Sequence, residues 1–169
     1  MQPGKLNDIV KPLCWLMGTW KSISARVSYP TMKCPVDYCE NLVFESVGQP
    51  LLNYHSLTWN PKDKSPMHLE SGFLRIDQDG CSVSFLIAQN FGIATVEEGC
   101  VEGSSISTES KSIGSTNFIK GQVVAIHRNY CLNEQGQLVF KMKLQTPKVP
   151  LTDHLHVVYE KEDCKPEKE

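Results

Sequence analysis

Two histidines stand one residue apart near the C-terminal end of the chain, in the run PLTDHLHVVYEK (residues 150–161). Alternate side chains of a β-strand share a face, so we expect His154 and His156 to point the same way. Such a pair could bind one zinc ion with a third ligand from elsewhere, or one imidazole could bind the iron of a planar cofactor. The spacing is also typical of strand histidines bonded to backbone or water, so the pattern alone leaves these alternatives open.

Other polar residues stand at the ends of apolar runs. Met67 and His68 begin the run MHLESGFLRI after a proline-containing turn, and Gln89 closes the run CSVSFLIAQ. The position of Met67 and His68 is more typical of a surface feature than of a binding pocket, and a turn-side amide would explain Gln89 equally well. We expect Glu97 and Glu98 to lie in a solvated region between a strand and a turn. The chain carries no G-x-S-x-G elbow, no P-loop and no dinucleotide-binding glycine motif, so it lacks the signatures of these enzyme classes.

The elements that must position these side chains are strands. About ten strand-like runs recur at roughly ten-residue spacing and are separated by turns rich in glycine, proline and asparagine. So many antiparallel strands close into a barrel or fold into a sandwich, because open edges promote aggregation. Polar residues on otherwise apolar faces, such as Glu40 beside Tyr38 and Leu42, favour a barrel with a ligand cavity. We expect the strands at residues 20–28, 36–46, 51–60, 68–76, 81–90, 92–101, 105–113, 122–132, 137–145 and 154–161.

The N-terminal part contains the one helical candidate, residues 6–17, with Asn7 or Asp8 as its N-cap. The first strand then opens with Gly18-x-Trp20, a pattern that recurs in ligand-binding barrels whose indole plugs one end. The sequence therefore predicts an all-β fold, an antiparallel β-barrel of about ten strands preceded by a short N-terminal helix.

Length, charge and cysteine content limit the class of protein. The 169 residues fit a single domain over 1–169, with a core of about 12–161 and a charged tail at 162–169. The formal net charge of −2 argues against a nucleic-acid or membrane partner, and no apolar run approaches the roughly 18 residues of a membrane helix. Seven cysteines without C-x-x-C, in a chain without a secretory signal, predict reduced thiols in a cytoplasmic protein. The oligomeric state stays open, with a homodimer among the options.

Several segments, taken in order, resemble the nitrobindin family, also described as the nitrobindin-like haem-binding domain. The matches follow the family order from about residue 12 to 161, and it is the ordered set that makes the resemblance specific. They are Leu16-x-Gly18-Thr19-Trp20, Tyr29-Pro30-Thr31, Gly48-Gln49-Pro50, Pro66-Met67-His68-x-Glu70-x-Gly72-Phe73, Ala88-Gln89-Asn90-x-Gly92, Val96-Glu97-Glu98-Gly99 and Pro150-Leu151-Thr152-x-His154-Leu155-His156-Val157-x-Tyr159.

The resemblance implies a barrel shaped like a fatty-acid-binding protein or lipocalin, with one ferric haem b per chain in its mouth. It implies that His154 binds the iron and that further residues line the haem or its cavity, namely Thr31, Met67, His68, Gln89 and Leu144. It also implies isomerisation of peroxynitrite to nitrate and reversible binding of nitric oxide. A single imidazole ligand leaves the sixth iron position open, and open ferric iron is a Lewis acid toward an anionic oxidant. No catalytic side chain is then needed in addition to the haem iron.

The chain departs from the family pattern in its first strand. Relatives often carry alternate glycines there, which let haem lie close to the backbone, whereas this chain has Ser22, Ser24 and Arg26. We expect Arg26 to fill space, shield the haem or meet a haem propionate.

Two alternative functions remain from the sequence. One is a carrier barrel for a fatty acid or another apolar ligand, which usually needs an interior arginine or tyrosine pair for a carboxylate. We expect Arg128 and Tyr130 to lie on opposite faces of one strand, which disfavours a carrier. The other is a haem or nitric oxide sensor without turnover, for which an attached effector domain would be expected.

Overall fold

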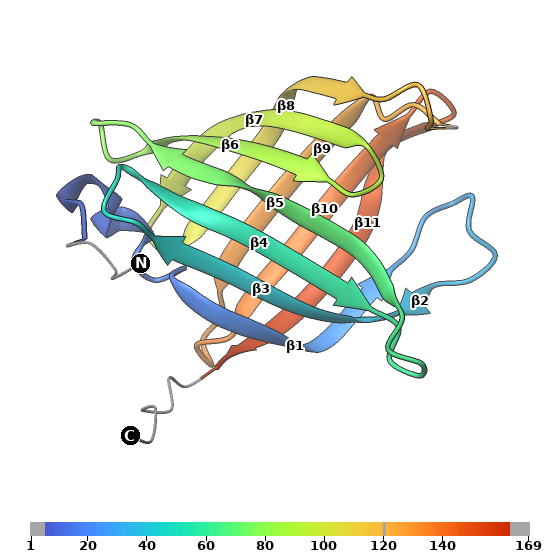
Figure 1. Ribbon diagram of the computed structural model, residues 1–169, viewed down its shortest axis with the longest axis horizontal. Helices are drawn as coiled ribbons and strands as arrows, with labels where there is room; N and C mark the ends of the chain where they lie inside the picture. Colours follow the sequence, from blue (N-terminus) through green and yellow to red (C-terminus); the bar gives the residue numbers. More distant parts are fainter. Residues whose placement is uncertain (1–5, 120, 163–169) are drawn as a thin grey trace.

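The structure is a computed structural model that describes residues 6–119 and 121–162. Within these residues the chain forms one 3-10 helix, η1, and eleven β-strands (Figure 1). The elements are η1 (Asp8–Leu13), β1 (Gly18–Val27), β2 (Val36–Asp37), β3 (Cys39–Ser46), β4 (Leu51–Trp59), β5 (Pro66–Ile76), β6 (Ser82–Gln89), β7 (Ile93–Glu102), β8 (Ser105–Ser115), β9 (Ala125–Leu132), β10 (Leu138–Thr146) and β11 (Val149–Lys161).

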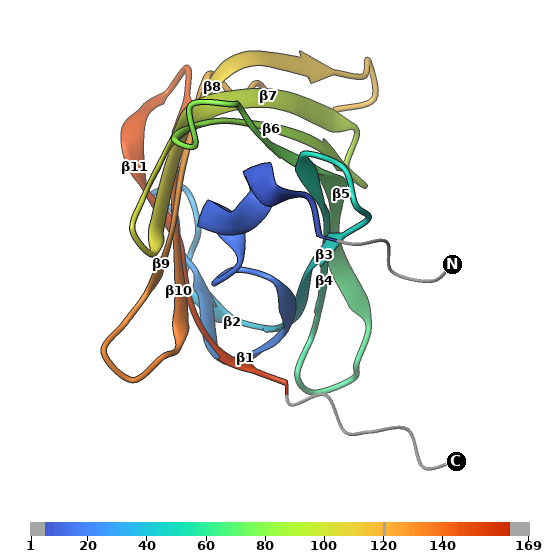
Figure 2. The same ribbon diagram turned by 90° about the vertical axis from the view of Figure 1, so that its left-hand side faces the viewer.

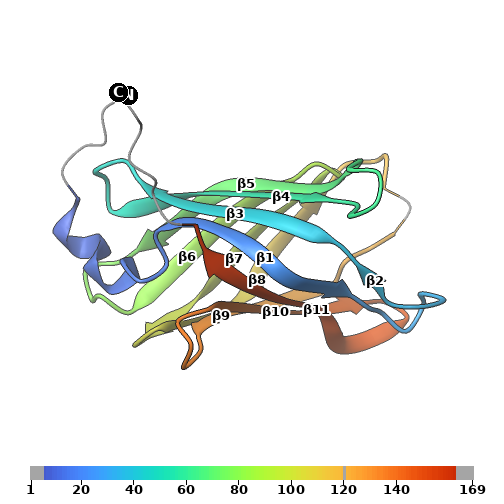
Figure 3. The ribbon, with the colours of Figure 1, turned by 90° about the horizontal axis from the view of Figure 1, so that it is seen from below.

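Ten of the strands form one closed antiparallel barrel. Each strand from β3 to β10 pairs with the next one along the chain, and β1 pairs with both β3 and β11 to close the ring (Figure 3). The short β2 pairs with the end of β1. The predicted all-β barrel is therefore confirmed. The stretch predicted as one strand at 36–46 is two strands, because Tyr38 lies between β2 and β3 outside both.

Helix η1 covers one end of the barrel (Figure 2). It begins at the predicted cap, where the side chain of Asn7 accepts a hydrogen bond from the N–H of Ile9 at 3.0 Å. The helix is shorter than the predicted 6–17 and is a 3-10 helix, with Pro12 inside it. Its residue Leu13 is fully buried, so the helix closes this end with apolar side chains.

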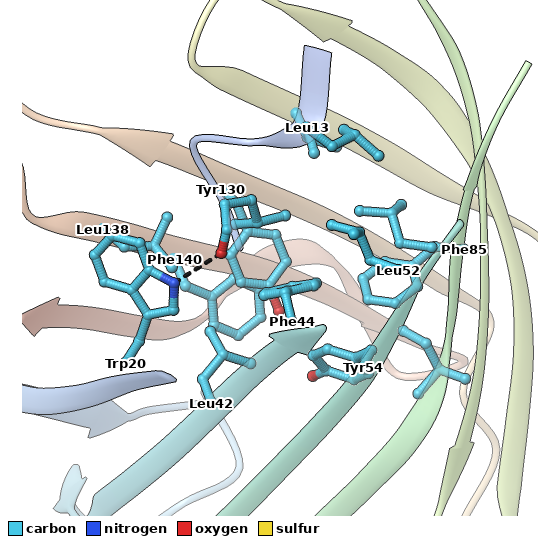
Figure 4. Close-up of a cluster of buried hydrophobic side chains, with 14 of the residues drawn as sticks. Leu13, Trp20, Leu42, Phe44, Leu52, Tyr54, Phe85, Tyr130, Leu138 and Phe140 are labelled. Carbon is cyan, nitrogen blue, oxygen red and sulfur yellow. Dashed lines mark hydrogen bonds between the residues drawn. The ribbon is translucent and has the colours of Figure 1, made fainter. Parts of the chain in front are cut away.

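The interior next to η1 is a packed apolar core. Trp20 is buried, and its indole N–H donates to the carbonyl oxygen of Leu16 at 2.8 Å. Tyr130 and Phe140 stack with their ring centroids 4.3 Å apart, and Phe44 packs edge-on against Tyr130 (Figure 4). Further buried side chains complete the cluster: Leu42, Leu52, Tyr54, Phe85 and Leu138. Because this end is filled, a ligand cavity must lie toward the other end of the barrel.

Gly72 in β5 lies where two strands approach closely. A Cβ atom at this position would stand 1.9 Å from the backbone carbonyl oxygen of Leu86 in β6, and that oxygen cannot rotate away. We expect Gly72→Ala to lower the free energy of unfolding by about 1–3 kcal/mol, as overpacking of an interior does. Urea unfolding would measure it, with Gly114→Ala as the control, since a Cβ there would contact Ala94 at an ordinary 3.9 Å. Equal losses in the two variants would contradict the expectation.

Two further features bear on the predictions. The six-residue η1 is too short to cross a membrane, and no other helix occurs in the described part of the chain. The six cysteines at positions 14, 34, 39, 81, 100 and 131 carry free thiols. Cys164 and, apart from Glu162, the charged tail predicted at 162–169 lie outside the described residues.

Candidate functional site

A cavity of about 340 Å³ lies in the barrel, toward the end that carries β2 and the turn between β4 and β5. Helix η1 is at the other end (Figure 1). Most of the wall is apolar, with contributions from β1, β5, β10, β11, the start of β7 and the turn that precedes it. The apolar side chains include Val27, Met67, Phe91, Ile93, Met142 and Leu155.

His154 projects into this cavity because β11 is bulged at that residue. The register between β10 and β11 passes from Leu155 opposite Met142 to Asp153 opposite Lys143, so His154 has no partner in β10. A bulge of this kind lets two consecutive side chains face the same side of a strand. Both His154 and Leu155 accordingly line the cavity.

The prediction that His154 and His156 share a face is therefore wrong. His156 is exposed on the outer wall, opposite Arg26 of β1. The two imidazoles cannot bind one metal ion together. Among residues 6–119 and 121–162, no group of three or more His, Cys, Asp or Glu side chains is placed to hold a metal ion. Within that part of the chain, the zinc alternative has no ligand set.

The imidazole of His154 is held in one orientation by the neighbouring strand end. The carbonyl oxygen of Ser28 can only accept, so Nδ1–H of His154 donates to it at 3.0 Å, and the N–H of Ser28 donates back to the carbonyl oxygen of His154 at 2.9 Å. Tyr29 packs edge-on against the ring, with centroids 5.2 Å apart. Burial lowers the pKa of His154 and outweighs the hydrogen bond to Ser28, so the ring is neutral at neutral pH. The Nε2 lone pair is then available as a metal ligand.

The cavity brings together most of the residues that the resemblance implied. Thr31 does not belong to this group: it is exposed in the segment between β1 and β2 and does not line the cavity. The residues that do share the cavity come from β5, β6, β10 and β11: Met67, His68, Gln89, Leu144 and His154.

The residues that replace the family glycines in β1 do not crowd the cavity. A bulge at Ile23 shifts the register from Ser22 opposite Tyr159 to Ser24 opposite Val158, so Ser24 and Arg26 face outward. The side chain of Arg26 is 60% exposed, and its Nε donates to Asp37 at 2.8 Å. The expectation that Arg26 fills the interior or shields a haem is therefore wrong. Ser22 remains half-buried, and its hydroxyl oxygen accepts from the N–H of Glu40.

A set of buried polar side chains, here termed the polar belt, crosses the interior from β3 to β9. Five of its members line the cavity, namely Glu40, Ser56, Thr58, Glu70 and Arg128. Such a set is informative because polar groups in an interior must be hydrogen-bonded or paired. The belt consists of Glu40, Ser56, Thr58, Glu70, Thr95, Glu97, Thr108 and Arg128.

Arg128 in β9 holds two carboxylates of the belt. Its two terminal nitrogens each donate to one oxygen of Glu70 at 2.9 Å, and its Nε donates to Glu97 at 3.0 Å. Two threonine hydroxyls also donate to Glu97, at 3.0 and 2.9 Å. Burial alone would raise the pKa of Glu70, but the charge of Arg128 and the hydrogen bonds from His68 and Arg128 outweigh it and hold that pKa far below its ordinary value. The guanidinium is thus fully engaged inside the protein.

Glu70 also links the belt to the cavity wall. His68 approaches it with Nε2 at 3.1 Å from Oε1, and the amide of Gln89 donates to the same oxygen at 3.0 Å. Tyr54 donates its hydroxyl to Oε2 at 2.6 Å. The ring of His68 also packs against Phe91, with centroids 4.9 Å apart. These contacts fix the side chains of His68 and Gln89 at the wall.

Two predictions about the belt are wrong. Glu97 is 0% exposed in the middle of β7, whereas Glu98 beside it faces solvent as predicted. Arg128 and Tyr130 are both buried on the inner face, because residues two apart in a regular strand point the same way. Sequence reasoning noted the inward position of Glu40 but did not treat it as a site residue; its signal was a carboxylate on an otherwise apolar face.

Comparisons with known proteins agree with this geometry. The family model described as the THAP4-like, heme-binding beta-barrel domain matches residues 9–161. The human protein named peroxynitrite isomerase THAP4 is 40% identical over 162 residues, which are 95% of this chain and 28% of that protein. An Arabidopsis thaliana protein named peroxynitrite isomerase Rv2717c is 32% identical over 92% of this chain and 90% of its own length. The crystal structure of Rv2717c from Mycobacterium tuberculosis matches with a TM-score of 0.84 at 30% identity, over 94% of this chain and 100% of that one.

Proposed function

We propose, because this chain belongs to the family of THAP4-like, haem-binding β-barrel domains, that it holds one ferric haem b in its cavity and isomerises peroxynitrite to nitrate. The geometry of His154 carries the proposal. Its ring is neutral and oriented by Ser28, and its Nε2 faces a mostly apolar cavity. The names of the relatives supply the substrate, although the chain spans only 28% of the length of the human relative.

The residues present fit a haem group. A haem needs an imidazole nitrogen that is not protonated and an apolar slot for its ring. His154 offers the first, because its other nitrogen is occupied by the Ser28 carbonyl oxygen. Val27, Phe91 and Leu144 contribute to the second. The outward position of Arg26 leaves the slot unobstructed by the longest side chain that replaces a family glycine.

The bound haem would supply an iron with one open coordination position, which is a Lewis acid toward an anionic oxidant. Peroxynitrite and nitrate have the same atoms and the same charge, so the isomerisation consumes no proton or electron overall. The protein therefore has three tasks. Ser28 orients the ligating ring, the apolar wall excludes water, and His68, fixed by Glu70, lines the space around the haem. The same open position would bind nitric oxide.

The polar belt argues against the fatty-acid carrier. A carrier of this shape needs a free interior cation for the ligand carboxylate. Among the described residues, Arg128 is the arginine or lysine that lines the cavity, and both Glu70 and Glu97 already neutralise it. A fatty-acid carboxylate placed beside Arg128 would meet the anionic Glu70 and Glu97, so its burial there would be unfavourable.

Stopped-flow absorbance tests the proposed turnover. We expect peroxynitrite to decay faster in proportion to the concentration of ferric, haem-loaded chain, with nitrate as the product. The haem-free chain is the control for reaction with cysteine or methionine side chains. A decay no faster than with the haem-free chain would contradict the isomerase and favour a haem or nitric oxide sensor. A lipid in an organic extract of the purified protein would favour the carrier.

A further inference from the structure

The polar belt contains one carboxyl group that no cation neutralises. Glu40 in β3 is 4% exposed and lines the cavity. Its Oε1 accepts a hydrogen bond from the hydroxyl of Ser56 at 2.6 Å. Within the described residues, Glu40 takes part in no ion pair, since Arg128 is shared between Glu70 and Glu97.

A buried carboxylate without a cation takes up a proton, because the charged form loses its hydration. Burial raises the pKa of Glu40 to about 7, against the hydrogen bonds from Ser56 and Tyr159, which lower it. Near neutral pH much of this carboxyl group is therefore neutral and carries an O–H donor. The other titratable or charged groups that face it come from β4, β5, β9, β11 and the residue before β3; they are Tyr38, Tyr54, His68, Glu70, Arg128, Tyr130 and Tyr159.

Tyr38 supplies a second donor beside Glu40. It stands two residues earlier, is 8% exposed and lines the same cavity. Its hydroxyl group lies beside the Glu40 carboxyl group and donates to it when that group is ionised. Burial, together with the charge of Glu40 when that group is ionised, raises the pKa of Tyr38, so the phenol keeps its proton. A phenol and a neutral carboxyl group thus face one cavity side by side.

We propose that Tyr38 and Glu40 form a two-donor site for a small oxyanion on the cavity wall. Two neutral donors stabilise a negative charge in a water-poor site without adding a buried charge of their own. Ser56 holds the Glu40 carboxyl group in place by donating to its other oxygen. The identity of the anion rests on the proposed function: peroxynitrite before the reaction, or nitrate after it.

The protonation state of Glu40 can be tested by infrared spectroscopy on the full chain. We expect the carbonyl stretching band of a neutral carboxyl group at about pH 6 and its loss as the pH rises through about 7. Glu40→Gln should remove this band. Glu45→Gln should leave it, because Glu45 is an exposed residue of the same strand. Absence of the band from the wild-type chain at about pH 6 would overturn the proposal.

Anion binding is tested with nitrate as the probe, by NMR titration of the full chain with and without haem. The affinity of the wild type should fall about ten-fold for each pH unit above the Glu40 pKa, since only the neutral form donates. Glu40→Gln should bind independently of pH, because an amide donates at every pH. Tyr38→Phe should bind roughly five-fold more weakly, the loss of one hydrogen bond. Nitrate binding by the wild type that does not change with pH would overturn the site.

These measurements separate the site from the proposed function. If the chain fails to bind haem but the haem-free form still shows the band and the pH-dependent nitrate binding, the proposed function fails and the oxyanion site stands. If haem and turnover are present but neither signal is found, the site fails alone. If Glu40→Gln does not fold, the wild-type pH dependence and Tyr38→Phe still decide.

Discussion

His154→Ala is expected to abolish the Soret band of the haem-loaded chain. The imidazole is the protein ligand that the geometry offers to haem iron, with its Nδ1 engaged by Ser28 and its Nε2 toward the cavity. Loss of a supporting hydrogen bond at a metal site weakens binding about 10–100-fold, and loss of the ligand itself should cost more than that. Titration of haem into the purified variant, followed by absorbance, measures the effect.

His156→Ala is the matched control for this variant. It removes the same type of side chain two residues further along β11, but from the outer wall, where His156 lies opposite Arg26. We expect its Soret band and haem affinity to equal those of the wild type. Circular dichroism should show a folded barrel in both variants, because His154 is only partly buried. An unchanged band in His154→Ala would remove the basis of the proposed haem site.

The barrel could be predicted because its signals are local. Period-two alternation and turn residues between the runs determine where antiparallel strands start and stop. The errors lie where pairing across the barrel decides the element. The last strand begins at Val149, five residues before its predicted start, because the two-residue turn at 147–148 lets β11 pair with β10 from Thr146 onward. Residues 36–46 divide at Tyr38, whose N–H bonds to Ala25 of β1.

The sequence predicted less well which site residues point into the barrel and which point outward. A bulge inverts the inward and outward positions that follow it, and the bulges at Ile23 and His154 arise from the fit between β1, β10 and β11. Local alternation therefore placed His156 wrongly, and the family glycine pattern did the same for Arg26. His154 was selected through the family resemblance, since its spacing alone left both a metal ligand and an ordinary strand residue open.

The polar belt shows a second limit of sequence reasoning. Glu40 was placed correctly among apolar neighbours, because no bulge interrupts that part of β3. The partner of Glu70 is Arg128, 58 residues later, and no local pattern connects them. The burial of Glu97 could not be expected either, since its partners come from β8 and β9. Charge pairs of this kind can be identified only from the three-dimensional structure of the closed barrel.

Arg128→Met is expected to lower the free energy of unfolding by about 3–5 kcal/mol at neutral pH. Removing one partner of a buried ion pair leaves the other charge without compensation. Here Glu70 and Glu97 would both lose their cation, at 8% and 0% exposure. Urea unfolding measures the loss. Arg26→Met is the control, because the Arg26 side chain is exposed and its ion pair with Asp37 is solvated, so little change is expected.

The pH dependence of stability should also reverse in Arg128→Met. In the wild type, the pKa of Glu70 is held below its unfolded value, so its stabilising contribution is present above that value and is lost as the pH falls below it. Without Arg128, burial dominates and raises the pKa of Glu70, so stability is lost as the pH rises above the unfolded value. The variant should therefore be closest to the wild type in mild acid and furthest from it at neutral pH. Adding Glu70→Gln and Glu97→Gln should recover much of the loss at neutral pH, since the uncompensated charges are gone. Parallel pH profiles for wild type and variant would show that Arg128 does not neutralise the belt.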